Sequence, residues 1–131
     1  MSVYTEVTRS QLEQFLTHYS VGKLIDFEGI PDGVENTNYR VLTTKGAFVL
    51  TLFEELDVIV LAHVLKLLAY LGSHSLLCSH PIIDNAGNTS RHFCTKPAAL
   101  FKWISGKGVL EPTVDQCYQI GLQLGKLCVF Q

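Results

Sequence analysis

A glycine-containing loop set between strand-like stretches is the feature that most constrains the fold of this chain. The loop reads GIPDGVENTNY and spans residues 29–39. A strand-like stretch at 23–28 precedes it, and two more, at 38–43 and 47–53, follow it around a glycine-containing turn at 44–46. The sequence therefore predicts three consecutive antiparallel strands, the first two joined by the long loop and the last two by a tight turn.

The long loop has the composition of a phosphate-binding turn. A glycine at position 33 leaves room for backbone N–H groups to approach phosphate oxygens, as in other phosphate-cradling loops. The candidate binding residues are Gly33, Val34, Glu35, Asn36 and Asn38. An ordinary turn, in which the asparagines hydrogen-bond their own backbone, explains the same residues, and so short a segment taken alone favours that simpler interpretation.

Two helices are predicted on either side of the three strands. The first begins at Thr8 or Ser10 and ends at Gly22. Its apolar face consists of Leu12, Phe15, Leu16 and Tyr19. The second, residues 57–71, is apolar almost all round, which is typical of a helix packed between a sheet and a second cover.

A third helix is predicted at the end of the chain. Thr113 and Gln116 have the spacing of a capping box at its start. Its apolar face consists of Cys117, Ile120, Leu124, Leu127 and Cys128. A helix this apolar rarely ends a complete domain, so we expect further protein to cover it.

The segment between the second and third helices predicts a hairpin and one more strand. Residues 82–84 and 89–95 flank a turn at 85–88, and a third strand covers 98–104. A regular hairpin of this register would set Cys78 opposite Cys94 and His80 opposite His92. Two cysteines and two histidines on one face suit tetrahedral zinc, but the spacing matches no known zinc finger and Pro81 disturbs the strand, so packed or exposed side chains are the default.

Composition and charge exclude several function classes. The net charge is -2, the pI is near 6.2 and no run of Lys and Arg occurs, which excludes nucleic acid as a main ligand. The N-terminus lacks the pattern of a signal peptide, and the longest apolar stretch, 58–71, is interrupted by His63 and Lys66. We therefore expect a soluble, cytoplasmic protein with no membrane partner and with its four cysteines reduced.

Five segments together resemble a known family. They are MSVYTEV at the start, DFEGIPDGVENTNYRV at 26–41, FVLTLFE at 48–54, KPAALFKWISGKGVLEPT at 96–113 and CYQIGLQLGKL at 117–127. Their order and sequence resemble the small lobe of the aminoglycoside phosphotransferase and choline kinase superfamily, and more closely the homoserine kinases built on that fold. Because of this resemblance, we interpret the glycine loop as part of a nucleotide site and not as an ordinary turn.

The resemblance implies an α+β, protein-kinase-like small lobe, an antiparallel sheet flanked by helices. Residues 1–108 would be the nucleotide-binding lobe, and 109–131 the truncated first helix of the large lobe. The activity implied for a complete enzyme is ATP-dependent phosphorylation of the homoserine hydroxyl, a step of threonine biosynthesis, with Mg as the metal that accompanies ATP.

The resemblance also implies roles for residues outside the loop. Kinases in general carry a phosphate-contacting lysine on the third strand, whereas this chain has Thr51 there, and the homoserine kinase branch looks similar in this respect. The following helix has no acid, and its one charged residue, Lys66, suits an exposed surface position. Phe101, Lys102 and Trp103 correspond to the segment that holds adenine through backbone groups; an ordinary core strand with Trp103 as its anchor is the alternative.

No catalytic residue is assigned within these 131 residues. The family's catalytic loop and its magnesium-binding Asp lie in the large lobe, and no H-G-D or H-R-D string occurs here. We therefore expect nucleotide binding without turnover from the chain alone, with a separate large-lobe partner left open. The alternative is a non-catalytic interaction module or remnant that dimerises through the apolar helices 58–71 and 114–130.

Overall fold

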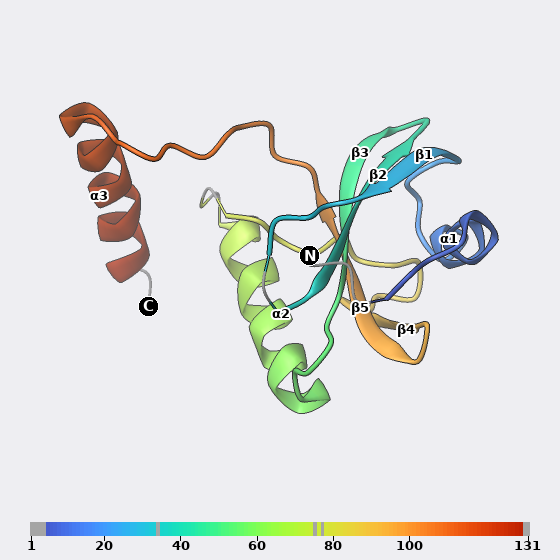
Figure 1. Ribbon diagram of the computed structural model, residues 1–131. Coiled ribbons are helices and arrows are strands. Elements are labelled where there is room, and N and C mark those ends of the chain that lie inside the picture. Colours follow the sequence, from blue (N-terminus) through green and yellow to red (C-terminus); the bar gives the residue numbers. More distant parts are fainter. Residues whose placement is uncertain (1–4, 34, 75, 77, 130–131) are drawn as a thin grey trace.

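The structure is a computed structural model that describes residues 5–33, 35–74, 76 and 78–129. Its elements follow the order helix, three strands, helix, two strands, helix (Figure 1). They are α1 (Arg9–Leu16), β1 (Leu24–Gly29), β2 (Thr37–Thr43), β3 (Gly46–Leu52), α2 (Val58–Ser73), β4 (Arg91–Phe93), β5 (Lys96–Lys102) and α3 (Val114–Cys128). This confirms the predicted order of the first five elements and of the last helix.

The five strands form one antiparallel sheet in the order β1-β2-β3-β5-β4. Along β2, buried residues alternate with partly exposed ones, so that Tyr39 and Val41 face one side while Asn38 and Arg40 face the other. Figure 1 shows α1 on one side of the sheet and α2 on the other. An antiparallel sheet flanked by helices is thus confirmed.

The main core lies between the sheet and α1. The Thr8 side chain accepts from Gln11 N and the Gln11 side chain from Thr8 N, which forms the capping box that starts α1. Phe15 of α1 packs against Phe93 of β4 with 4.7 Å between ring centroids. The buried cluster on this side, the α1 cluster, comprises Val7, Leu12, Phe15, Leu16, Tyr19, Val21, Tyr39, Val41, Phe48, Leu50, Leu52, Phe93, Ala98 and Leu100.

Gly22 does not end α1, which stops at Leu16. Gly22 has a φ of +85° and lies against the β2–β3 turn, where a Cβ would stand 2.3 Å from Thr44 Oγ1. The close approach lets Lys23 N donate to Thr44 Oγ1 and Thr44 N donate to Lys23 O. The glycine therefore joins the segment after α1 to the hairpin instead of terminating the helix.

α2 covers the other face of the sheet through one side only. Asp57 caps its start by accepting from Ile59 N at 2.8 Å. Leu61 and Leu65 pack on Ala99 of β5 and form with it a small buried cluster, the α2 cluster. The outward side exposes large apolar residues: Val58, Ile59, Val60, Val64, Leu67 and Tyr70. The prediction of a helix between the sheet and a second cover is confirmed on its sheet side.

α3 lies beyond α2 at the end of an extended segment (Figure 1). Its predicted capping box is present, with Thr113 accepting from Gln116 N and the Gln116 side chain accepting from Thr113 N. No residue of α3 is buried. None of the helices in the described part of the chain is long and apolar enough to cross a membrane.

The predicted hairpin between 82–84 and 89–95 is wrong. Residues 82–84 form no strand, and the hairpin that does form joins β4 and β5 through Cys94 and Thr95, with φ values of 51° and 65°. Two consecutive positive φ angles are those of a tight hairpin turn. The strand predicted over 98–104 accordingly begins earlier, at Lys96, and ends at Lys102.

The observed pairing of β4 with β5 removes the basis for a zinc site. His92 lies opposite Pro97 in the β4–β5 pairing, and Cys94 is in the turn, so the register that would pair the two cysteines and the two histidines does not form. Among the residues that the structure describes, no group of three or more His, Cys, Asp and Glu side chains could hold a metal ion.

Asp84 explains why its segment forms a loop and not a strand. Its buried carboxylate accepts from Ala86 N, Asn88 N and Arg91 Nη1, the last at 2.7 Å. Burial acts to raise the pKa of Asp84, but the hydrogen bonds from Asn88, Arg91 and Ala86 outweigh it and lower the pKa to about 2. The charged carboxylate therefore holds the loop closed.

Replacing Gly22 with alanine should destabilise the fold more than replacing Gly87, which has nearly the same φ of +86° but open space around its Cβ position. Gly87→Ala carries only backbone strain, about 1 kcal/mol. Gly22→Ala adds a clash with Thr44, so we expect a loss of about 2 kcal/mol or more in urea unfolding. Equal losses of unfolding free energy in the two variants would contradict the close approach of Gly22 to Thr44.

Stability should depend on pH through Asp84. Its folded-state pKa lies below the unfolded value, so its contribution is fully present above about pH 4 and is lost as the pH falls towards 2. Between pH 5 and pH 2 the free energy of unfolding of the wild-type chain should fall by about 2 kcal/mol more than that of Asp84→Asn. Parallel pH profiles for the two chains would show that the carboxylate is not held in this way.

Candidate functional site

The long loop closes around Asn38, the second residue of β2. Ile30 N donates to Asn38 O at 2.8 Å, and Asn38 Nδ2 donates to Asn36 O at 3.4 Å. Gly33 is exposed with a φ of +139°, and a Cβ there would lie 3.4 Å from Asn38 Nδ2. Gly33, Asn36 and Asn38 are thus brought together, while Val34 lies outside the described residues.

Thr51 of β3 holds the Asn38 side chain from the neighbouring strand. The two residues are opposite each other in the β2–β3 register, and Thr51 Oγ1 donates to Asn38 Oδ1 at 2.7 Å. This bond occupies the amide oxygen and leaves Nδ2 directed to the loop. The predicted site residues Asn38 and Thr51 therefore form one polar pair on the α2 side of the sheet.

The loop also lies against the connection between β3 and α2. Glu35 and Asn36 line a cavity of about 240 Å³ together with Phe53, Glu55 and Leu56. Lys66, in contrast, is exposed on α2, as its surface interpretation predicts. The loop residues Glu35 and Asn36 therefore lie beside the segment that leads from β3 into α2.

The end of β5 lies at the opposite end of the same face. Phe101 pairs with Val49, which pairs with Arg40, so these three residues share the α2 side. The Arg40 guanidinium lies 5.2 Å from the centre of the Trp103 ring. The Phe101 side chain is partly buried and packs against the α2 cluster, which supports its interpretation as part of an ordinary core strand.

The side chain of Lys102 faces away from the α2 side, unlike those of Asn38, Thr51 and Phe101. It pairs with Phe48, whose ring is in the α1 cluster, so the lysine side chain leaves the sheet on the α1 side and is exposed. On the α2 face, Lys102 can contribute only backbone groups. The resemblance implies just that use of this segment.

Sequence reasoning missed Arg40, although alternation along β2 could have found it. Arg40 is two residues after Asn38, so the pleat places both on the same face. Its Nη1 lies 3.7 Å from Glu28 Oε1 on β1. A cation held by a carboxylate and an aromatic ring therefore stands between the polar pair and the β5 end.

Sequence reasoning also missed an ion pair at the point where the loop joins β2. Glu54 accepts from Thr37 Oγ1 at 2.6 Å and from Thr5 Oγ1 at 2.7 Å, and it pairs with Lys96. Thr37 is the residue at which the chain leaves the loop and enters β2. Because Thr37 pairs with Leu52 of the α1 cluster, this lysine–glutamate pair lies on the α1 side of the sheet, away from Asn38.

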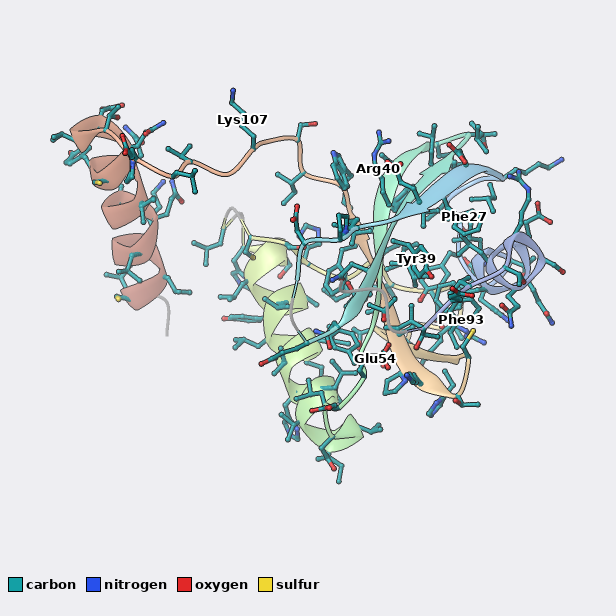
Figure 2. The ribbon with its side chains drawn as sticks, viewed as in Figure 1. Phe27, Tyr39, Arg40, Glu54, Phe93 and Lys107 are labelled. Atoms are coloured by element: carbon teal, nitrogen blue, oxygen red, sulfur yellow. The ribbon has the colours of Figure 1, made fainter. Side chains whose placement is uncertain are left out.

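Figure 2 shows how far apart the two ends of the sheet lie. Glu54 is near the end at which the loop enters β2, and Arg40 is towards the other end. A separate cavity of about 300 Å³ lies on the α1 side, between α1 and β4, and includes His18 and His92 in its lining. The α2 face and this cavity are thus two distinct places at which a small molecule could bind.

Comparison with known proteins gives the family. Residues 26–130 match the phosphotransferase enzyme family. The homoserine kinase of Methylobacterium radiotolerans is 38% identical over 131 residues, covering 97% of this chain and 40% of that protein. The homoserine kinase of Methylobacillus flagellatus is 39% identical over 127 residues, with the same coverage. The chain therefore spans about 40% of the length of these relatives.

A solved structure supports the fold. A spectinomycin phosphotransferase, determined in complex with ADP and spectinomycin, matches 89% of this chain and 36% of its own, with a TM-score of 0.71 and 15% sequence identity. At that identity the likeness concerns the fold alone, the N-terminal lobe of a kinase-like protein. The family follows from the sequence match over residues 26–130, which shows that this chain belongs to the phosphotransferase enzyme family.

Proposed function

We propose that this chain is the nucleotide-binding lobe of a homoserine kinase-like phosphotransferase. One observation carries the proposal: the glycine loop, the Asn38–Thr51 pair and the β5 end all lie along one face of the sheet. The relatives that cover the chain are homoserine kinases. In this proposal the ligand is ATP, with its phosphates at the loop and its base at the β5 end.

At the phosphate end, the chain offers backbone N–H groups and one side-chain amide. Gly33 permits close approach, and the backbone at positions 35 and 36 supplies donors without a cationic side chain. Asn38 Nδ2 is a further donor, and Thr51 fixes its direction. Magnesium would accompany ATP as a counterion, and we place its protein ligands outside these residues.

At the base end, the backbone of Phe101, Lys102 and Trp103 holds the adenine edge. The backbone of Trp103 is itself fixed, because its N–H donates to Ala47 O at 3.1 Å. The Trp103 ring is partly exposed and is the one tryptophan of the chain. It is therefore a direct fluorescence reporter of nucleotide binding.

The complete enzyme would transfer the γ-phosphoryl group of ATP to the homoserine hydroxyl, in the threonine pathway and in the cytoplasm. Residues 1–108 would form the nucleotide lobe and 109–131 the first helix of the large lobe. The chain covers about 40% of the length of its relatives. In this proposal the catalytic base and the magnesium ligands belong to the remainder of the complete enzyme. We therefore expect these 131 residues to bind nucleotide without turnover; homoserine-dependent ADP release from the purified chain would contradict this.

A second candidate function is an interaction module, and the exposed apolar surface favours it. Leu110 of the segment before α3 is fully exposed, and Ile120 and Leu124 of α3 expose 67% and 59% of their surface. Exposed apolar residues in such number mark an interface with further protein. In the first proposal a large lobe would cover this apolar surface. In the second, another copy of the chain would cover it.

Nucleotide binding should depend on Gly33. A valine there cannot adopt the φ of +139° without strain, and its side chain would occupy the space that phosphate oxygens need. We expect Gly33→Val to weaken Mg-ATP binding by about tenfold or more in calorimetry, the loss of one or two charge-assisted hydrogen bonds. Gly108→Val, at an exposed glycine with open space around it, is the matched control and should bind as the wild type does. An unchanged affinity for Gly33→Val would contradict a phosphate site at the loop.

Sedimentation velocity separates the two candidate functions. If a second copy covers α3, the chain should dimerise as its concentration rises, and Ile120→Lys with Leu124→Lys should return it to a monomer. These substitutions lie on α3, which stands apart from the sheet in Figure 1, and should leave Mg-ATP affinity unchanged. A monomer at every concentration would exclude the second candidate.

A further inference from the structure

Arg40 occupies a defined place on the proposed nucleotide face. It is two residues beyond Asn38 along β2, about 7 Å further from the loop. Its strand partner is Val49, and its guanidinium reaches across β3 to lie 5.2 Å from the centre of the Trp103 ring. The residue therefore stands at the base end of the face and not at the phosphate end.

The guanidinium is held in place but not enclosed. Trp103 packs on it, and Glu28 lies 3.7 Å from Nη1. Even so, 42% of the Arg40 side-chain surface remains exposed. The neighbouring carboxylate offsets part of its charge, which favours the use of Arg40 as a flat surface over its use as a free cation for phosphate.

We propose that Arg40 is the surface on which the nucleotide base stacks, and that it makes the site prefer purine over pyrimidine nucleotides. The proposal rests on the proposed function, since it assumes that a nucleotide binds on this face. A planar guanidinium stacks on aromatic rings, and a two-ring purine covers more of it than a one-ring pyrimidine. Trp103 and Glu28 keep the plane oriented before the ligand arrives.

The test compares ATP with CTP, which carry the same phosphates and differ only in the base. The ratio of the CTP to the ATP dissociation constant, measured by calorimetry, isolates the base contribution from any general effect on the fold. In the unsubstituted chain the ratio should exceed one, and in Arg40→Leu it should fall about two- to fivefold, the strength of one partly exposed stacking contact. Arg40→Lys, which keeps the charge and loses the plane, should lower the ratio similarly.

Two further probes serve as controls. Arg9→Leu removes an arginine of α1 on the other side of the sheet and should leave the ratio unchanged. Inorganic tripolyphosphate has no base, so its affinity should be the same in the wild type and in Arg40→Leu.

The outcomes distinguish failure of this inference from failure of the proposed function. An unaltered ratio in Arg40→Leu, with ATP still bound, would overturn the role of Arg40 and leave the nucleotide site standing. Equal weakening of ATP, CTP and tripolyphosphate would overturn it too, because Arg40 would then act on the phosphates. Absence of ATP binding by the unsubstituted chain would overturn both.

Discussion

The register between β2 and β3 is the constraint on which the rest of the structure depends. Tyr39 pairs with Leu50 on the α1 side, and Asn38 pairs with Thr51 on the α2 side. A slip of one residue would turn the apolar side chains out of the core and the polar pair into it. The tight turn after Thr43 sets this register, and Gly22 holds that turn against the segment following α1.

The register divides the sheet into two faces with different tasks. The α1 face buries the larger core and also contains the Glu54–Lys96 pair, in which Glu54 accepts hydrogen bonds from Thr37 and Thr5. The α2 face keeps polar and aromatic groups partly accessible. The lysine–glutamate pair is thus a structural anchor in this chain, and the Asn38–Thr51 pair is the part of the sheet that we propose takes part in ligand binding.

The parts of the fold that local signals specify could be predicted from the sequence. The β2–β3 hairpin has a glycine turn, and Thr113 with Gln116 is a capping box, so both were found. The β4–β5 hairpin could not be found, because its turn residues, Cys94 and Thr95, carry no turn signal and are forced to positive φ by the sheet. The competing signal at 85–88 was real, but Asp84 uses it to close a loop.

The candidate site, too, could be predicted only in part from the sequence. The glycine loop, Asn38 and Thr51 could be chosen from sequence, and the structure brings them together, although their binding of ATP stays a prediction. The side chain of Lys102 and the role of Arg40 depend on which face each strand residue occupies, which requires the register.

The most direct test of a nucleotide site on the α2 face is an amide and indole chemical-shift map of the chain titrated with Mg-ATP. If ATP binds on this face, the largest shifts should fall at Gly33, Asn38 and Thr51 and on the indole N–H of Trp103. Shifts concentrated instead around His18 and His92, at the cavity between α1 and β4, would contradict it, as would a folded chain that shows none.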